Sequence, residues 1–206
     1  MAEYKDYGYT HNRPRHTFSY LTAPLLAMLS TGKNRHILDL GCGNGYLVSY
    51  LLKEGYNAYG TDASENGIAI ARQEHPDRFF LQDLSTGKLP KELQSIPFDT
   101  IISTEVIEHL YDPQGFIDFC KNCLPKNGEL IISTPYHGYL KNLVLSIMNK
   151  WDTHWSPMWY GGHIKFWSRN TLSKLLRDKG FEVTGFKGCG RVPFFWKSMI
   201  IKAKLP

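Results

Sequence analysis

Two kinds of hydrophobic pattern alternate along most of the chain. Short, nearly continuous apolar runs predict strands that are buried on both faces, and the stretches between them have the spacing of amphipathic helices. The expected strands span residues 36–40, 57–62, 78–83, 98–105 and 128–135. The expected helices between them span residues 45–55, 64–74 and 112–124. This alternation predicts an α/β fold, in which a parallel sheet carries helices on both faces.

The two ends of the chain depart from this pattern. Residues 1–30 predict a polar, Tyr-rich arm followed by a helix that Pro24 starts or interrupts. Toward the other end, a helix precedes two strand candidates, 181–187 and 194–203, which lie close enough in sequence to pair as a hairpin. We interpret the whole chain, 1–206, as a single domain.

Residues 138–166 are predicted to form a lid-like insertion. The insertion contains a helix whose apolar residues recur at helical spacing, and a Trp-rich stretch follows that helix. The apolar positions are Leu140, Leu143, Val144, Ile147 and Met148, and the tryptophans are Trp151, Trp155, Trp159 and Trp167. The segment could wall a hydrophobic pocket, lie against a membrane surface, or cover an edge of the sheet.

Composition narrows the class of protein. The 206 residues are 42% apolar and 21% charged, which is typical of a soluble globular protein. No apolar run approaches the ~18 residues of a membrane span, and the N-terminus lacks the apolar stretch of a signal peptide. Four cysteines do not form a disulfide framework, so we expect a cytoplasmic location. The net charge of +5 indicates either an ordinary basic surface or a surface that attracts an anionic partner. No pattern of interleaved basic and aromatic residues favours binding to nucleic acid.

The most specific local signal is a glycine loop directly after the first expected strand. Gly41, Gly43 and Gly45 are spaced G-x-G-x-G, and glycine lets the backbone approach a ligand closely. Asp62 ends the second expected strand, 21 residues beyond Gly41. A carboxylate at that distance is typical of sites that bind the two hydroxyls of a ribose.

These residues carry a family resemblance. The segment DLGCGNGYL, Asp62, the run Gln82-Asp83-Leu84 and the pair Phe98-Asp99 resemble the class I S-adenosylmethionine-dependent methyltransferases, closely over about 33–135. The resemblance implies a Rossmann-like sheet of seven mostly parallel strands with a reversed last strand. It also implies S-adenosylmethionine as cofactor and S-adenosylhomocysteine as product.

The resemblance assigns cofactor roles by position. Asp39 and the backbone at Gly41, Gly43 and Gly45 are expected to hold the methionine part of the cofactor. Asp62 is expected to bind both ribose hydroxyls. Asp83 is expected to accept from the adenine amino group, with Leu84 beside the ring and Glu105 near the cofactor.

The candidate catalytic residues follow the fourth expected strand, in the segment Glu105-Val106-Ile107-Glu108-His109. If residues 105–110 form a helical turn, Glu105, Glu108 and His109 share one face, where they could bind a divalent metal or act as a general base. We expect His109 to be the base because of its position, with Glu108, His137 and His163 as further candidates, and we assign no metal ligand.

The segment also resembles two groups within the methyltransferases. Glu-Val-Ile-Glu-His is similar to the corresponding segment of the ubiquinone-biosynthesis O-methyltransferases and to the metal-binding segment of the small-RNA 3′-terminal 2′-O-methyltransferases, where His163 could supply a further ligand. We expect methyl transfer to a hydroxyl of a small or lipid-like acceptor, such as a polyprenylated phenol, quinol or glycan. The alternatives are a metal-dependent methyltransferase of RNA 3′ ends and a non-catalytic cofactor-binding module that regulates a partner.

Overall fold

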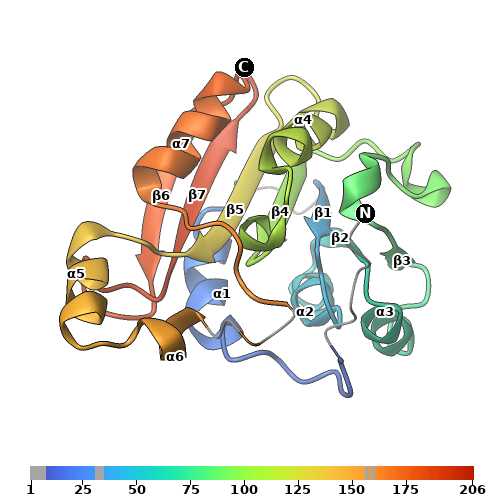
Figure 1. Cartoon of the computed structure of the whole chain (residues 1–206). Helices are drawn as coiled ribbons and strands as arrows, with labels where there is room; N and C mark the ends of the chain where they lie inside the picture. Colours follow the sequence, from blue (N-terminus) through green and yellow to red (C-terminus); the bar gives the residue numbers. More distant parts are fainter. Residues whose placement is uncertain (1–7, 31–34, 156–157, 159–160) are drawn as a thin grey trace.

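Seven strands form one sheet in the order β3-β2-β1-β4-β5-β7-β6 (Figure 1). The computed structural model describes residues 8–30, 35–155, 158 and 161–206. The strands are β1 His36–Leu40, β2 Asn57–Asp62, β3 Phe79–Leu81, β4 Thr100–Thr104, β5 Glu129–Pro135, β6 Glu182–Cys189 and β7 Ser198–Lys204. The first five strands pair in parallel, and the predicted parallel α/β sheet is therefore confirmed.

The last strand is reversed, as the family resemblance implies. β7 pairs antiparallel with both β5 and β6, and its register against β5 runs from Glu129↔Lys204 to Pro135↔Ser198. The sequence prediction began this strand at residue 194, which is four residues too early. Pro193 has no N–H for the ladder, and Phe194 has a left-handed backbone with φ 69°, so the chain turns here and pairing begins at Ser198.

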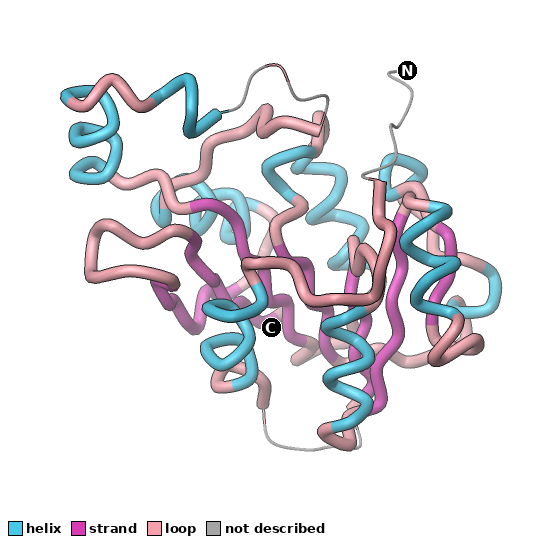
Figure 2. Tube along the Cα trace, turned by 90° about the horizontal axis from the view of Figure 1, so that it is seen from below, coloured by secondary structure: helices cyan, strands magenta, loops and turns pink. Residues whose placement is uncertain are grey.

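Helices cover both faces of the sheet (Figure 2). One buried cluster joins the sheet to α1, α2 and α3, and another joins it to α4 and α7. The helices are α1 Phe18–Leu26, α2 Tyr46–Lys53, α3 Glu65–Arg72, α4 Pro113–Cys123, α5 Tyr139–Ile147, α6 Trp151–Trp155 and α7 Arg169–Asp178. α1 continues through Pro24, which neither starts nor interrupts it. No helix in the described parts of the chain is long and apolar enough to span a membrane.

The two helices of the predicted insertion, α5 and α6, lie beyond the ends of the strands (Figure 1). The edge strands are β3 and β6, and α5 follows the interior strand β5 in sequence. That the insertion covers an edge of the sheet stays a prediction. The orientation of α5 is unexpected. Its apolar residues Leu143 and Ile147 are 41% and 76% exposed, whereas Lys141 is its one buried residue.

Candidate active site

A cavity of about 1050 Å³ lies where the parallel strands end. Its wall includes Gly41 after β1, Asp62 at the end of β2, Asp83 after β3, Glu105 after β4 and Pro135 at the end of β5. Open α/β sheets bind ligands at this edge, because the loops that leave the strands converge there. The volume slightly exceeds the roughly 300–1,000 Å³ of pockets that hold one small ligand, so it has room for a cofactor and part of a second molecule.

The glycine loop forms one side of the cavity through its shape. Gly41, Gly43 and Gly45 all have positive φ angles. A Cβ atom on Gly41 would lie 2.3 Å from a methyl carbon of Val106, and one on Gly45 would lie 2.6 Å from Ala71 Cβ. Larger residues at these positions would therefore push the loop away from its neighbours.

The backbone N–H groups of the three glycines donate hydrogen bonds within the protein. The N–H of Gly41 donates to the Thr61 carbonyl, and that of Gly45 donates to the Cys42 carbonyl. The N–H of Gly43 donates to Asp62. These N–H groups are therefore already bonded within the protein, and Gly41 and Gly43 line the cavity, whereas Gly45 does not and packs beneath it. That the backbone of the loop holds the methionine part of a cofactor stays a prediction.

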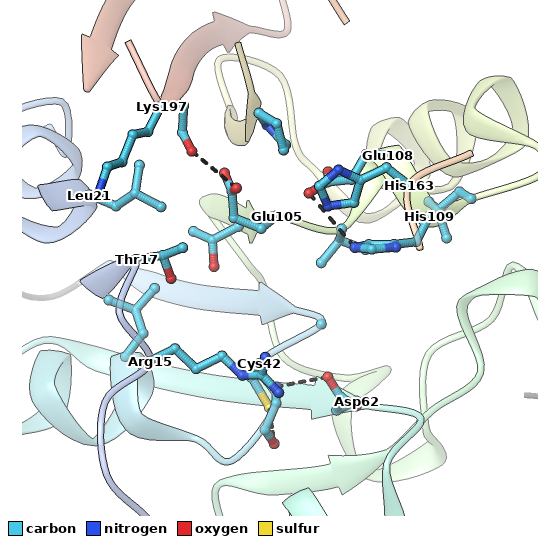
Figure 3. A pocket seen from close by; sticks show the side chains of 18 of the residues that line it. Arg15, Thr17, Leu21, Cys42, Asp62, Glu105, Glu108, His109, His163 and Lys197 are labelled. Carbon is cyan, nitrogen blue, oxygen red and sulfur yellow. Dashed lines mark hydrogen bonds and ion pairs between the residues drawn. The ribbon is translucent and has the colours of Figure 1, made fainter. Parts of the chain in front are cut away.

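Asp62 is fixed by two backbone groups. Its Oδ2 accepts from the Gly43 N–H at 2.7 Å, and its Oδ1 accepts from the Ser64 N–H at 2.8 Å. These two backbone donors hold the carboxylate in one orientation at the edge of the cavity. In Figure 3 the side chain of Arg15 extends from the N-terminal arm toward Cys42 and Asp62.

Asp39 lies behind the loop and does not line the cavity. Its side chain is 1% exposed, and neither carboxyl oxygen has a hydrogen-bond partner among the described residues. Burial, and then the charge of Asp62, raise the pKa of Asp39 to about 8, so the group is mostly a neutral acid at pH 7. The expected direct contact between Asp39 and a cofactor is therefore not supported.

Residues that follow β3 form another part of the cavity wall. Asp83 Oδ1 accepts from the Ser85 N–H at 2.8 Å, which begins a short 3₁₀ helix, Leu84–Thr86. Asp83 and the half-buried Leu84 both line the cavity, as the resemblance implies. Gln82 lines it as well, and its buried Oε1 has no hydrogen-bond partner within the described chain. Sequence reasoning noted Gln82 only as part of the motif.

Glu105 is separated from the turn in which the sequence placed it. The 3₁₀ helix covers only Ile107–His109, and Glu105 has a left-handed backbone with φ 56°. Its Oε1 accepts from the Ser133 hydroxyl at 2.8 Å, and its Oε2 accepts from the Ser198 hydroxyl at 3.1 Å. Burial raises the pKa of Glu105 to about 7, while the two serine hydroxyls act in the opposite direction. The predicted shared face of Glu105, Glu108 and His109 is thus wrong.

Glu108, His109 and His163 form the cluster instead (Figure 3). One ligand atom from each lies within 4.8 Å of the others. The Glu108 backbone carbonyl accepts from the N–H groups of Ile164 and Lys165, and this pairing brings His163 to the cluster. His163 was proposed from the resemblance, since no local pattern connects it to residues so far away in sequence.

The cluster is buried and its electrostatics favour neutral groups. Glu108 Oε2 accepts from Thr134 Oγ1 at 3.0 Å, whereas Oε1 has no hydrogen bond in the described residues and lies 3.9 Å from His109 Nε2. Burial, and then His163, lower the pKa of His109 to about 4. Burial and the charge of Glu105 raise the pKa of Glu108. His109 Nδ1 lies 3.2 Å from the Gly162 carbonyl, so a proton on Nδ1 leaves Nε2 as an acceptor.

His137 and the described tryptophans of the Trp-rich stretch are not part of the cavity wall. The His137 ring packs against the rings of His154 and Phe166, and it does not line the cavity, which gives its proposed role as a base no support. Trp151, Trp155 and Trp167 do not line the cavity either. Trp159 lies outside the described residues. The insertion instead contributes polar and apolar side chains to the wall: Lys141, Val144, Leu145, Lys150, Thr153, His154 and His163.

Comparisons with known proteins agree with this geometry. Residues 9–185 match the family described as Methyltransferase domain. The chain is 32% identical to a ubiquinone biosynthesis O-methyltransferase of Coxiella burnetii, over 82% of this chain and 76% of that protein. It is 30% identical to the protein of the same name from Dinoroseobacter shibae, over 76% of this chain and 63% of the relative. The chain thus spans less than two thirds of the latter's length.

A solved structure shares the fold. The magnesium protoporphyrin IX methyltransferase of Synechocystis PCC 6803, solved with bound SAH, superposes with a TM-score of 0.66 at 23% identity, covering 90% of this chain and 80% of that one. The family match covers most of the chain and includes the glycine loop, Asp62 and the cluster around Glu108. The chain belongs to the methyltransferase domain family.

Proposed function

We propose that this chain transfers the methyl group of S-adenosylmethionine to a hydroxyl of a small or lipid-like acceptor. The observation that carries the proposal is the single cavity that joins the fixed carboxylate of Asp62 to the buried cluster of Glu108, His109 and His163. One end suits a nucleoside, and the other offers proton acceptors. Relatives named ubiquinone biosynthesis O-methyltransferase support an acceptor such as a prenylated phenol.

The residues of the cavity fit the cofactor. Asp62 is oriented to receive the ribose hydroxyls, and Asp83 with Leu84 can receive the adenine amino group and the ring. The positive φ angles of Gly41 and Gly43 allow the chain to pass close to the methionine part. We assign Asp39 and Gly45 to the support of this loop rather than to contact.

S-adenosylmethionine supplies a methyl group that is already activated by the positive sulfur. As the acceptor oxygen bonds to the methyl carbon, the carbon–sulfur bond breaks, and its electron pair leaves neutral S-adenosylhomocysteine. The hydroxyl proton must go to a base, and we assign it to His109 Nε2, which lies 3.9 Å from Glu108 Oε1. The cavity contributes mainly alignment, because in-line attack needs the two reacting atoms about 3 Å apart.

An assay with a methyl-labelled cofactor tests this function. We would offer a prenylated catechol and an oligosaccharide as acceptors, and compare the parent with Asp62→Ala. The matched control is Asp77→Ala, since Asp77 is exposed and does not line the cavity. Label in the catechol that depends on Asp62 but not on Asp77 supports the proposal. A folded parent that binds no S-adenosylhomocysteine contradicts it.

A second candidate is a metal-assisted form of the same reaction. Two imidazoles and one carboxylate with an unpaired buried oxygen form a donor set that suits Zn²⁺, Mn²⁺ or Fe²⁺ better than Mg²⁺, which prefers oxygen. A cation there would lower the pKa of the acceptor hydroxyl. Activity that is lost to a chelator and restored by Mn²⁺ would favour this candidate.

A further inference from the structure

The buried ammonium of α5 is the feature that the proposed chemistry leaves unexplained. Lys141 is 6% exposed and lines the cavity. Its Nζ donates to the Tyr136 carbonyl at 2.7 Å and to the Lys197 carbonyl at 3.4 Å. Removing an ammonium from water is unfavourable unless an opposite charge compensates it, and two carbonyl oxygens carry no net charge.

Besides Arg15, which extends toward Asp62, three further cationic side chains line the same cavity: Lys150, Arg191 and Lys197. In the parts of the chain that the structure describes, no carboxylate oxygen lies within 4.0 Å of any of these four cationic groups. Lys202, which lies toward the other end of β7, differs, because its ammonium lies 2.9 Å from Glu129. Burial, and then the charge of Arg191, lower the pKa of Lys141 to about 8. The charge of Arg191 thus acts on an ammonium that burial already disfavours.

The acidic groups of the cavity do not fully neutralise these cations. Glu105 is the carboxyl group that acts electrostatically on Lys141, but burial raises its pKa to about 7, so it carries only part of a negative charge at pH 7. Asp62 lies at the end of β2, and β1 and β4 separate that strand from β5, which precedes α5. Three strand spacings amount to roughly 14 Å, so a ribose at Asp62 would leave the cations free for another molecule.

We propose that the acceptor carries an acidic group, a carboxylate or a phosphate, that binds at Lys141 and Arg191. The inference rests on the proposed function, because it names the class of acceptor for the same cavity. The acidic group compensates the buried ammonium and holds the acceptor at one point. The hydroxyl to be methylated then lies toward Glu105 and the cluster of Glu108, His109 and His163.

Calorimetry tests the proposal with three small-molecule probes whose hydrocarbon tails have the same length. Octanoate, octyl phosphate and octanol would be titrated into the parent chain saturated with S-adenosylhomocysteine. A charge-assisted hydrogen bond to a buried cation favours the two anions over octanol by about tenfold or more. Whichever anion binds more tightly identifies the acidic group.

Variants separate the site from the general positive charge of the protein. Lys141→Met and Arg191→Gln should each weaken both anions by about tenfold and leave octanol unchanged, while Lys141→Arg should retain most of the affinity. Lys91→Met is the matched control, since Lys91 is exposed and does not line the cavity. Arg191 is exposed as well, so its variant tests the proposal even if Lys141→Met does not fold.

The outcomes distinguish this inference from the proposed function. Equal affinity for octanol and the two anions, or equal losses in Lys141→Met and Lys91→Met, overturn the inference while cofactor binding stands. A parent that binds no S-adenosylhomocysteine overturns the function on which the inference rests.

Discussion

The backbone N–H of Gly43 donates a 2.7 Å hydrogen bond to Oδ2 of Asp62. This bond joins the glycine loop after β1 to the acidic residue that ends β2. Because the Ser64 N–H holds the other carboxylate oxygen, Asp62 is oriented before any ligand arrives. Such preorganisation lowers the cost of binding a diol, since no side-chain freedom is lost at that step.

Gly45 should be far less tolerant of a side chain than Gly87. Both have positive φ, but a Cβ on Gly45 would lie 2.6 Å from Ala71 and Phe79, whereas one on Gly87 meets nothing within 4 Å. Backbone strain alone should cost Gly87→Ala about 1–2 kcal/mol, and overpacking should add about 1–3 kcal/mol in Gly45→Ala. Urea unfolding measures the free energy of unfolding of both variants. Equal losses of stability would show that packing beneath the loop is unimportant.

The neutral form of Asp39 should appear as a pH-dependent stability. The folded pKa of about 8 lies above the ordinary value of 3.8, so the folded state binds more protons between these values. Stability contributed by this group is present at low pH and is lost as pH rises through that window. The free energy of unfolding of Asp39→Asn relative to the parent should therefore increase from about pH 5 to about pH 8. A difference that does not change with pH contradicts this assignment, and Asp77→Asn is the exposed control.

His109→Ala should reduce kcat by about 10²–10⁴ and be partly recovered at high pH, where the acceptor ionises without help. His36→Ala is the control, because His36 begins β1 at the opposite end of the sheet. Steady-state kinetics with a labelled acceptor provide the measurement. If both variants keep the parental kcat, the proton does not leave through His109.

Exhaustive chelation should leave the activity intact, because the positive sulfur already activates the methyl group. Turnover before and after treatment with a chelator is the comparison. Glu108→Gln serves as an internal check, since it removes one charged donor from the cluster and keeps the shape of the side chain. Loss of activity that Mn²⁺ restores, with the same loss in Glu108→Gln, would replace the simple base with the metal-assisted form.

The arrangement of strands and helices was predictable because it depends on local pattern. The run Ile101-Ile102 and its equivalents indicate buried strands, and the cap at Ser64 indicates the start of α3. The glycine loop and Asp62 were found from spacing alone. The family resemblance added the reversed strand and the part played by His163.

The predictions fail where contacts between residues far apart in the sequence determine the local structure. Glu105 leaves the turn because Ser133 and Ser198, on β5 and β7, hold its carboxyl group. Helical periodicity shows that α5 has two faces but not which one turns inward, so Lys141 was overlooked. Whether His137 or His163 reaches the cavity depends on the pairing of residues 164 and 165 with Glu108, which no local pattern shows.

The central claim is that this chain binds S-adenosylmethionine through the carboxylate of Asp62. Calorimetry of S-adenosylhomocysteine with the parent, Asp62→Ala and Asp77→Ala tests it most directly. Loss of hydrogen bonds worth roughly 1.5–3 kcal/mol should weaken binding by at least about tenfold in Asp62→Ala, while Asp77→Ala should match the parent. An unchanged dissociation constant in folded Asp62→Ala would contradict the account.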